Sequence, residues 1–215
     1  MIRVVIVDDE ALIRSGFSLI LAVAGDIEVV ATARGGEALA TIAEHQPDVV
    51  LLDIRMPDID GLTILRELRR GDRPPVVGIL TTFDADEYVA QALSGGAAGF
   101  ILKDTDPQHL AQFVRALAAG AVVLSPQVTG AVIRPAEEDT VRARQLLTTL
   151  TSRETTVLRH IADGLTNAEI GVQMFLSAAT VKDHVSVILT KLRVTGRIQA
   201  ALLAQRAGLL DRPAP

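Results

Sequence analysis

The sequence has no cysteine and no apolar run that approaches the roughly 20 residues needed to cross a bilayer. The absence of cysteine excludes disulfides, thiolate nucleophiles and cysteine-based zinc or iron–sulfur sites. Any chemistry must therefore rest on oxygen and nitrogen groups. The N-terminus also lacks the charged-then-apolar pattern of a secretion signal. These absences predict a soluble, cytoplasmic protein without membrane contact.

The composition is that of an ordinary globular protein, with 49% of the 215 residues hydrophobic and 22% charged. The net charge of −5 is unevenly divided. Residues 1–125 carry 10 Lys and Arg against 18 Asp and Glu, a net charge of −8, whereas residues 126–215 carry 11 against 8, a net charge of +3. Although many solvated surfaces are equally basic, the C-terminal part is the candidate for a polyanionic partner.

The first 120 residues alternate short apolar runs with helical patterns. The runs are mostly continuous, as expected of strands covered on both faces; they span residues 2–7, 28–32, 48–52, 76–80 and 99–102. The helical stretches between and after them span about 11–23, 36–45, 62–70, 85–93 and 107–118. Five such units predict an α/β domain built on a doubly wound, five-stranded parallel sheet.

The pattern after residue 120 is helical. Ser125 followed by Pro126 is a helix-start signal for a short helix to about 133. Residues 136–149 have no clear core face and are interpreted as a linker, either extended or partly helical. Two capping boxes then follow, and four short helices are expected beyond residue 150. The second and third of them have the spacing of a helix-turn-helix. We expect domains at 1–120 and 148–215, joined by a helix and linker at 121–147.

Polar side chains occur where the predicted strands end. Asp8 and Asp9 follow the first strand, Asp53 follows the third, Thr81 ends the fourth and Lys103 follows the fifth. Parallel order places all five at one edge of the sheet. Clustered carboxylates repel one another unless a cation intervenes, and oxygen-rich clusters suit Mg²⁺. Each residue alone could be a cap or a turn residue, but the set predicts a metal-dependent site.

The chemistry of the cluster points to phosphoryl transfer. A carboxylate such as that of Asp53 can attack phosphorus and form an acyl phosphate. The metal and Lys103 would then neutralise the oxygens of the transferring group. Thr81 could donate a hydrogen bond to that group once it is in place.

The strand-end motifs resemble the receiver domain of response regulators over about 120 residues. They are Val-Asp-Asp-Glu at 7–10, Asp-Ile-Arg-Met-Pro at 53–57 with Asp-Gly at 60–61, Leu-Thr-Thr at 80–82 and Gly-Phe-Ile-Leu-Lys at 99–103. The resemblance implies that Asp53 is the phosphoacceptor. It also implies a Mg²⁺ site made by Asp8, Asp9, Asp53 and the backbone carbonyl of Arg55.

Two further roles follow from the same resemblance, and a third follows from the position and size of Phe83. Thr81 and Lys103 correspond to the pair that contacts the phosphoryl group. Phe100 corresponds to the switch aromatic, which turns inward when Thr81 moves toward the phosphate. The alternative for Phe100 is a simple core residue. Phe83, two residues beyond Thr81, would border the phosphoryl group and exclude water, so that self-dephosphorylation is slow.

The third C-terminal helix has a buried stripe at helical spacing, formed by Val181, Val185, Ile188, Leu189 and Leu192. Five short, basic or acidic residues lie outside the stripe: Thr180, Lys182, Asp183, Ser186 and Lys191. They could be a solvated face or could reach phosphates and base edges in a major groove. Residues 150–209, with Leu-Thr-Ser-Arg-Glu at 150–154 and Thr-Val-Lys-Asp-His-Val at 180–185, resemble the LuxR/NarL-type helix-turn-helix, which implies DNA binding.

Together the two resemblances imply a two-component response regulator of the NarL/FixJ type. A sensor histidine kinase would phosphorylate Asp53, and this phosphorylation would control binding to double-stranded promoter DNA. A homodimer is expected to bind paired half-sites. One alternative is a phosphatase of the haloacid dehalogenase type, but that class has Asp-x-Asp after the first strand, whereas Asp8 and Asp9 are adjacent. A second alternative is a protein with the same fold but without the phosphorylation switch, which would be a constitutive DNA binder or a protein-binding adaptor.

Overall fold

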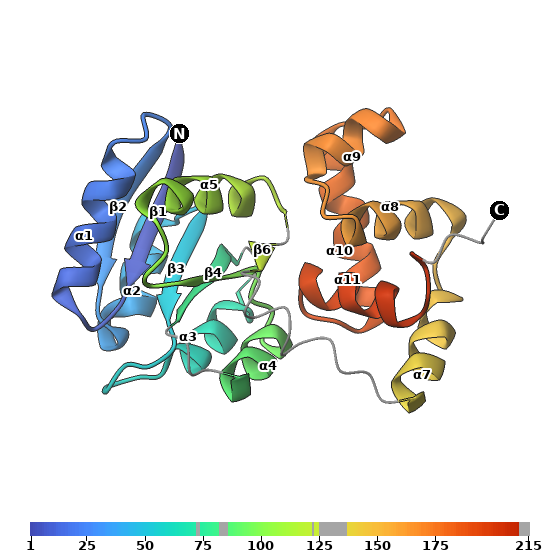
Figure 1. Cartoon of the computed structure of the whole chain (residues 1–215), viewed down its shortest axis with the longest axis horizontal. Coiled ribbons are helices and arrows are strands. Elements are labelled where there is room, and N and C mark those ends of the chain that lie inside the picture. The colour runs from blue at the N-terminus through green and yellow to red at the C-terminus, as the bar shows by residue number, and fades with distance from the viewer. Residues whose placement is uncertain (72–73, 82–85, 122, 125–136, 211–215) are drawn as a thin grey trace.

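The computed structural model describes residues 1–71, 74–81, 86–121, 123–124 and 137–210. They form an α/β half, residues 1–124, and a helical half, residues 137–210 (Figure 1). The helix expected at 125–133 and the predicted role of Phe83 lie outside the described residues. Among the helices that are described, none has the length and apolar character to span a membrane.

The α/β half is a parallel sheet with strand order β2-β1-β3-β4-β5-β6. The strands are β1 (Ile2–Val7), β2 (Ile27–Ala33), β3 (Val49–Asp53), β4 (Val76–Thr81), β5 (Gly99–Leu102) and β6 (Val123–Leu124). The five expected strands are present, and the two-residue β6 is an additional one that no apolar pattern marked. Because β1 and β3 are neighbours while β2 lies outside β1, the connections reverse direction between them, which is where such sheets bind ligands.

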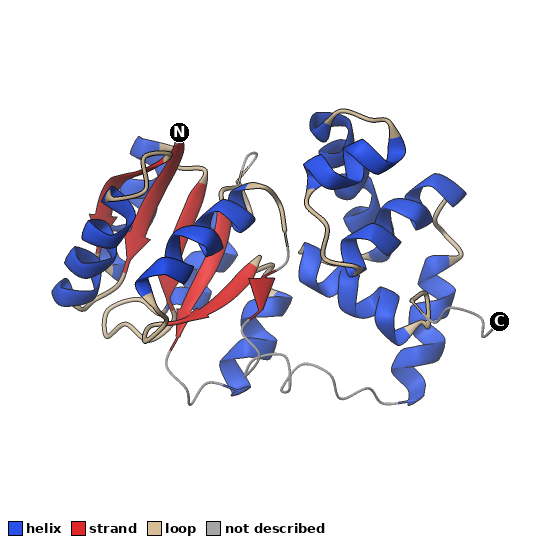
Figure 2. Ribbon diagram, turned by 45° about the horizontal axis from the view of Figure 1, so that its top comes forward, coloured by secondary structure: helices blue, strands red, loops and turns tan. Residues whose placement is uncertain are grey.

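Helices cover both faces of the sheet (Figure 2). They are α1 (Ala11–Ala22), α2 (Gly35–His45), α3 (Gly61–Leu68), α4 (Asp86–Ser94) and α5 (Pro107–Ala118). Phe17 of α1 and Phe113 of α5 pack in one apolar cluster, whereas Ile42 of α2 and Ile64 of α3 pack in the other. All five residues of β3 are buried, because a strand at the centre of such a sheet is covered on both sides.

The helical half contains α7 (Glu137–Leu147), α8 (Ser152–Ala162), α9 (Asn167–Met174), α10 (Ala178–Leu192) and α11 (Arg197–Arg206). Thr151 and Thr166 form the two expected capping boxes, with Glu154 and Glu169 respectively. The expected linker at 136–149 is helical over residues 137–147, which form α7. The expectation that it has no clear core face is wrong, because Ala143 is buried and Leu146 and Leu147 pack against the apolar cluster of α8–α11.

A tight turn joins α9 to α10. Phe175 ends α9 in the left-handed conformation, with φ of 55°, and the Ser177 side chain accepts a hydrogen bond from the Thr180 backbone N–H at the start of α10. Val181, Ile188 and Leu192 form the buried side of α10, as the apolar stripe predicted. The pair of helices is therefore a helix-turn-helix with α10 in the position of the recognition helix.

The two halves meet at the turn between α10 and α11. The Thr195 hydroxyl donates to the Ser94 carbonyl oxygen at 2.6 Å. A Cβ on Gly196 would lie 3.1 Å from Gly96 Cα, so the two backbones are in close contact. Ile198 of α11 is buried within the apolar cluster of the α/β half. This contact places α11 against the end of α4.

Candidate functional site

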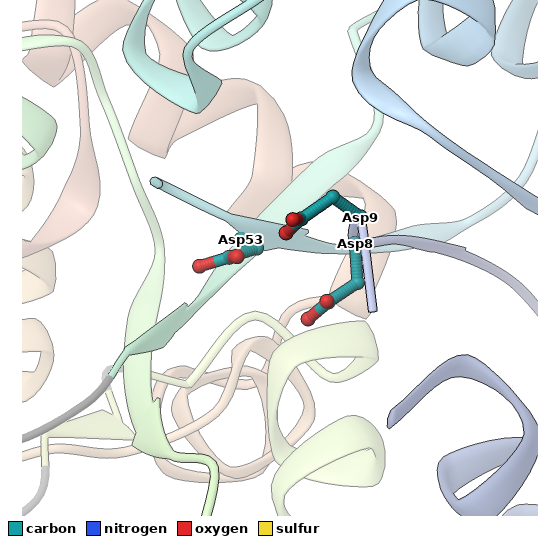
Figure 3. A group of neighbouring side chains, drawn as sticks. All are labelled: Asp8, Asp9 and Asp53. Carbon is teal, nitrogen blue, oxygen red and sulfur yellow. The ribbon is translucent and has the colours of Figure 1, made fainter. Parts of the chain in front are cut away.

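Three carboxylates gather at the carboxyl edge of the sheet. Asp53 is the last residue of β3, and Asp8 and Asp9 follow β1, its neighbour in the sheet. One carboxylate oxygen from each lies within 4.8 Å of the other two, and Figure 3 shows the three side chains extending from adjacent strand ends. The structure thus brings together the acidic residues that the sequence placed at this edge.

Asp8 is fully buried and incompletely satisfied. Its Oδ1 accepts a hydrogen bond from the Glu10 backbone N–H at 2.9 Å. Its Oδ2 forms an ion pair with Lys103 Nζ at 2.9 Å but has no hydrogen-bond partner among the described residues. Burial raises the pKa of Asp8, although Lys103 acts in the opposite direction. An underbonded, buried carboxylate oxygen is a feature that a bound cation would satisfy.

Asp53 is buried, with 4% of its surface exposed. Its Oδ2 accepts a hydrogen bond from Lys103 Nζ at 3.0 Å, and its Oδ1 accepts one from the Arg55 backbone N–H at 3.3 Å. Burial raises the pKa of Asp53, and the nearby Asp8 adds to the increase, while Lys103 lowers it. Burial disfavours the charged form of Lys103, but the adjacent carboxylates of Asp8 and Asp53 outweigh this effect and raise its pKa. Lys103 is therefore held as a cation among acids.

The donor set fits a hard divalent cation. Carboxylate oxygens are the ligands that Mg²⁺ prefers, with several waters retained. Asp8, Asp9 and Asp53 offer such oxygens within coordination reach of one another. Lys103 supplies only one positive charge to Asp8, Asp53 and Glu10. The excess of negative charge favours a further cation.

A cavity of about 230 Å³ lies beside Asp53. Its lining includes Thr81 and Lys103, as expected, and also Glu10 and Tyr88. The sequence reasoning did not single out either of these two as a site residue. Glu10 could have been found from its place next to Asp9, whereas Tyr88 lies on α4 and reaches the site only through tertiary packing.

Thr81 and Phe100 lie on neighbouring strands. Thr81 ends β4 and is buried, with 5% of its surface exposed. Phe100 lies on β5, is 1% exposed and packs with the helices α2, α3 and α4. The Arg55 guanidinium lies 5.3 Å from the centre of the Tyr88 ring, a cation–π contact at the rim of the cavity. These side chains link the acidic cluster to the α4 side of the sheet.

Four of the five residues expected to contact DNA lie on the outer side of α10. Lys182, Asp183 and Ser186 are exposed, and Thr180 is half-buried at the N-terminal end. Lys191 is placed differently, because its Nζ lies 2.7 Å from Glu154 Oε2 in an ion pair between α10 and α8. The α/β half contacts the turn that follows α10, so these outer residues stay accessible.

Known proteins similar to this chain belong to families that agree with this arrangement of sites. Residues 4–115 match the response regulator receiver domain, and residues 148–204 match the bacterial regulatory proteins of the luxR family. The chain is 35% identical to transcriptional regulatory protein LiaR of Bacillus subtilis (strain 168), over 98% of this chain and 100% of LiaR. The chain belongs to the response regulators with a LuxR-type DNA-binding domain. It is a DNA-binding transcriptional regulator of the two-component type.

Other relatives of this response regulator cover nearly the whole chain. The probable transcriptional regulatory protein NarL of Mycobacterium tuberculosis is 37% identical, over 98% of this chain and 96% of that protein. The crystal structure of ChrA, the response regulator of a heme-sensing two-component system, has a TM-score of 0.53 and 35% identity, and covers 97% of this chain and 98% of ChrA. These matches favour a transcription regulator over the phosphatase alternative.

Proposed function

We propose that Asp53 of this response regulator accepts a phosphoryl group from a sensor histidine kinase, in a reaction that requires Mg²⁺. The observation that carries the proposal is the convergence of Asp8, Asp9 and Asp53 with Lys103 at one edge of the sheet. An Asp53 carboxylate oxygen attacks phosphorus, the bond from phosphorus to the donor breaks, and an acyl phosphate forms. The metal, bound by the three carboxylates and the Arg55 carbonyl, would neutralise charge on the phosphoryl oxygens.

The other site residues stabilise the phosphoryl group and couple its presence to a shift in the receiver. Lys103 Nζ lies 3.0 Å from Asp53 Oδ2 and can shift to contact the phosphoryl oxygens once they are bonded to Asp53. Thr81, at the end of the neighbouring strand, donates a hydrogen bond from its hydroxyl to the phosphoryl group. The segment that carries Phe100 shifts when Thr81 moves. Beyond this transfer and a slow loss of its own phosphoryl group, the receiver catalyses no reaction.

Removal of the buried Asp8 carboxylate tests the metal site. Asp8→Asn should lower Mg²⁺ affinity by about tenfold or more, because a carboxylate ligand is lost and the excess negative charge falls. Mg²⁺ titration followed by NMR of the amides around Asp53 measures the affinity without any phosphodonor. Asp26→Asn is the matched control, since Asp26 precedes β2 at the opposite edge and pairs with Arg115. Equal Mg²⁺ affinity in wild type and Asp8→Asn would contradict this metal site.

The DNA interface in this proposal is the outer side of α10. Lys182 and Ser186 lie one turn apart and are exposed, so they can reach a phosphate and a base edge from one helix. Because its carboxylate repels DNA phosphates, Asp183 can lie in this interface only beside a hydrogen-bond donor such as the cytosine amino group. Lys191 can join the interface only by leaving Glu154.

Lys182→Ala should weaken DNA binding and lower the slope of log affinity against log salt by about one, as expected when one phosphate contact is lost. Arg3→Ala is the matched control, because it removes the same charge from an exposed position on β1. Fluorescence anisotropy at several salt concentrations measures both slopes. Identical slopes for wild type and Lys182→Ala would place the interface elsewhere.

The regulatory step in this proposal is a change in how the two halves meet. The Asn167 backbone N–H, at the start of α9, donates to the Ala119 carbonyl oxygen at 3.2 Å. In helix-turn-helix proteins the first helix of the pair crosses the DNA backbone, and helix N-termini bind phosphate. Phosphorylation of the receiver, 1–120, would break the contact of Asn167 with Ala119. This end of the DNA-binding domain, 148–215, would then be free, while the covalent connection at 121–147 still joins the two domains. Two released copies would then bind paired half-sites as a homodimer.

A further inference from the structure

A large cavity lies where the α/β half meets the helical half, away from the acidic site. Its volume is about 700 Å³, within the range of about 300–1,000 Å³ that is typical of small-molecule sites. Leu93 and Ser94 at the end of α4 form one wall, α7 forms a second, and the ends of α10 and α11 complete it. The cavity is therefore built by three segments that are far apart in the sequence.

The charged residues among the described lining of the cavity are all basic. Arg142 of α7, Arg193 at the end of α10 and Arg206 at the end of α11 all line it, and no acidic side chain is among the described lining residues. None of these three guanidinium groups forms an ion pair within the part of the chain that the structure describes. Three guanidinium groups along one cavity, with no acidic side chain among its described lining residues, favour the binding of an anion.

The rest of the described wall mixes polar and aliphatic side chains. Leu146, Leu202 and Leu203 are the partly exposed leucines that line it, beside Ser94, Gln145 and Gln199, and none of the described lining residues is aromatic. A ligand that depended on ring stacking would find no partner ring there. An extended hydrocarbon chain would instead remove leucine surface from water.

We propose that this cavity binds a small aliphatic anion, with its charged group on the arginines and its hydrocarbon chain on the leucines. Because α4 and α11 both contribute walls, the ligand binds the docked arrangement of the two halves and stabilises it. The ligand therefore opposes the release that activates DNA binding. That last consequence rests on the proposed function, whereas binding itself does not.

Calorimetric titration of the full-length, unphosphorylated protein with octanoate, below its micelle concentration, tests the site. We expect one saturable site per chain, with binding at least about tenfold weaker for acetate and for octan-1-ol, which lack the chain and the charge respectively. The double variant Arg193→Asn with Arg206→Gln should lower octanoate affinity by about tenfold or more. Asparagine suits the left-handed backbone at position 193, where φ is 55°.

Arg159→Gln is the matched control, because Arg159 is exposed on α8 and does not line the cavity. The same titration on Asp53→Asn protein should give an unchanged affinity, which separates this site from phosphorylation. The proposal is overturned if octanoate does not saturate, if octan-1-ol binds equally well, or if the double variant binds octanoate like the wild type.

Discussion

Asp53→Asn should abolish phosphoryl labelling by acetyl phosphate and every effect of that donor on DNA binding. Asparagine keeps the shape of the side chain but has no carboxylate oxygen that can attack phosphorus. It also removes the negative charge that faces Lys103 and one of three carboxylates in the cluster. The effect is therefore all-or-none for labelling, whereas the basal affinity for DNA should stay close to that of the wild type.

Folding of the Asp53→Asn variant should be intact. Burial raises the pKa of Asp53, which means that the folded chain holds the ionised form less favourably than water does. Loss of that charge near neutral pH should leave Tm unchanged or raise it. Asp26→Asn, at the opposite edge of the sheet, should be labelled like the wild type. Labelling of Asp53→Asn at the wild-type level would place the phosphoacceptor elsewhere.

Gly61→Ala should destabilise the receiver and slow its phosphorylation. A Cβ at this position would overlap the Asp53 carbonyl oxygen and lie 2.9 Å from Ile54 Cα. Both obstacles are backbone atoms, so the loop from β3 to α3 must move. The loss should reach the upper part of the range of about 1–3 kcal/mol that is typical of overpacking. The movement would also displace the Arg55 carbonyl from the proposed metal site.

Gly16→Ala provides the matched control for Gly61→Ala. Gly16 lies in the middle of α1, and nothing lies within 4 Å of a Cβ added there. The same substitution should therefore stabilise the chain by about 0.5–1 kcal/mol. Urea unfolding of both variants measures the two opposite shifts, and initial rates of acetyl phosphate labelling measure the damage to the site. A Gly61→Ala protein as stable as the wild type would refute this account of the loop.

The sequence could predict the α/β half closely because its strands are continuous apolar runs. Residues 49–53 have only Val, Leu and the terminal Asp53, and the structure buries all five. Strand-end positions follow from parallel order, so the gathering of Asp8, Asp9 and Asp53 was accessible from spacing alone. The core face of α7 could not be predicted because its sequence is strongly polar, and only the packing of Leu146 and Leu147 against α8–α11 reveals it.

Features that depend on packing between distant segments could not be predicted. The position of Tyr88 in the lining of the cavity beside Asp53 depends on how α4 lies on the sheet. The ion pair of Lys191 with Glu154 joins two helices, and helical periodicity only placed Lys191 outside the apolar stripe. The contact of Thr195 with Ser94 also has no local signal, because a hydroxyl and a carbonyl can pair almost anywhere.

The most direct test of a phosphorylation-controlled DNA switch uses beryllofluoride, a stable mimic of the phosphoryl group. Binding isotherms would be recorded at fixed salt and Mg²⁺ concentration, on the DNA sequence that the protein itself selects from a random pool. We expect beryllofluoride to strengthen binding by about tenfold or more in the wild type and to have no effect on Asp53→Asn. Isotherms that coincide with and without beryllofluoride would contradict the switch and favour a constitutive DNA binder.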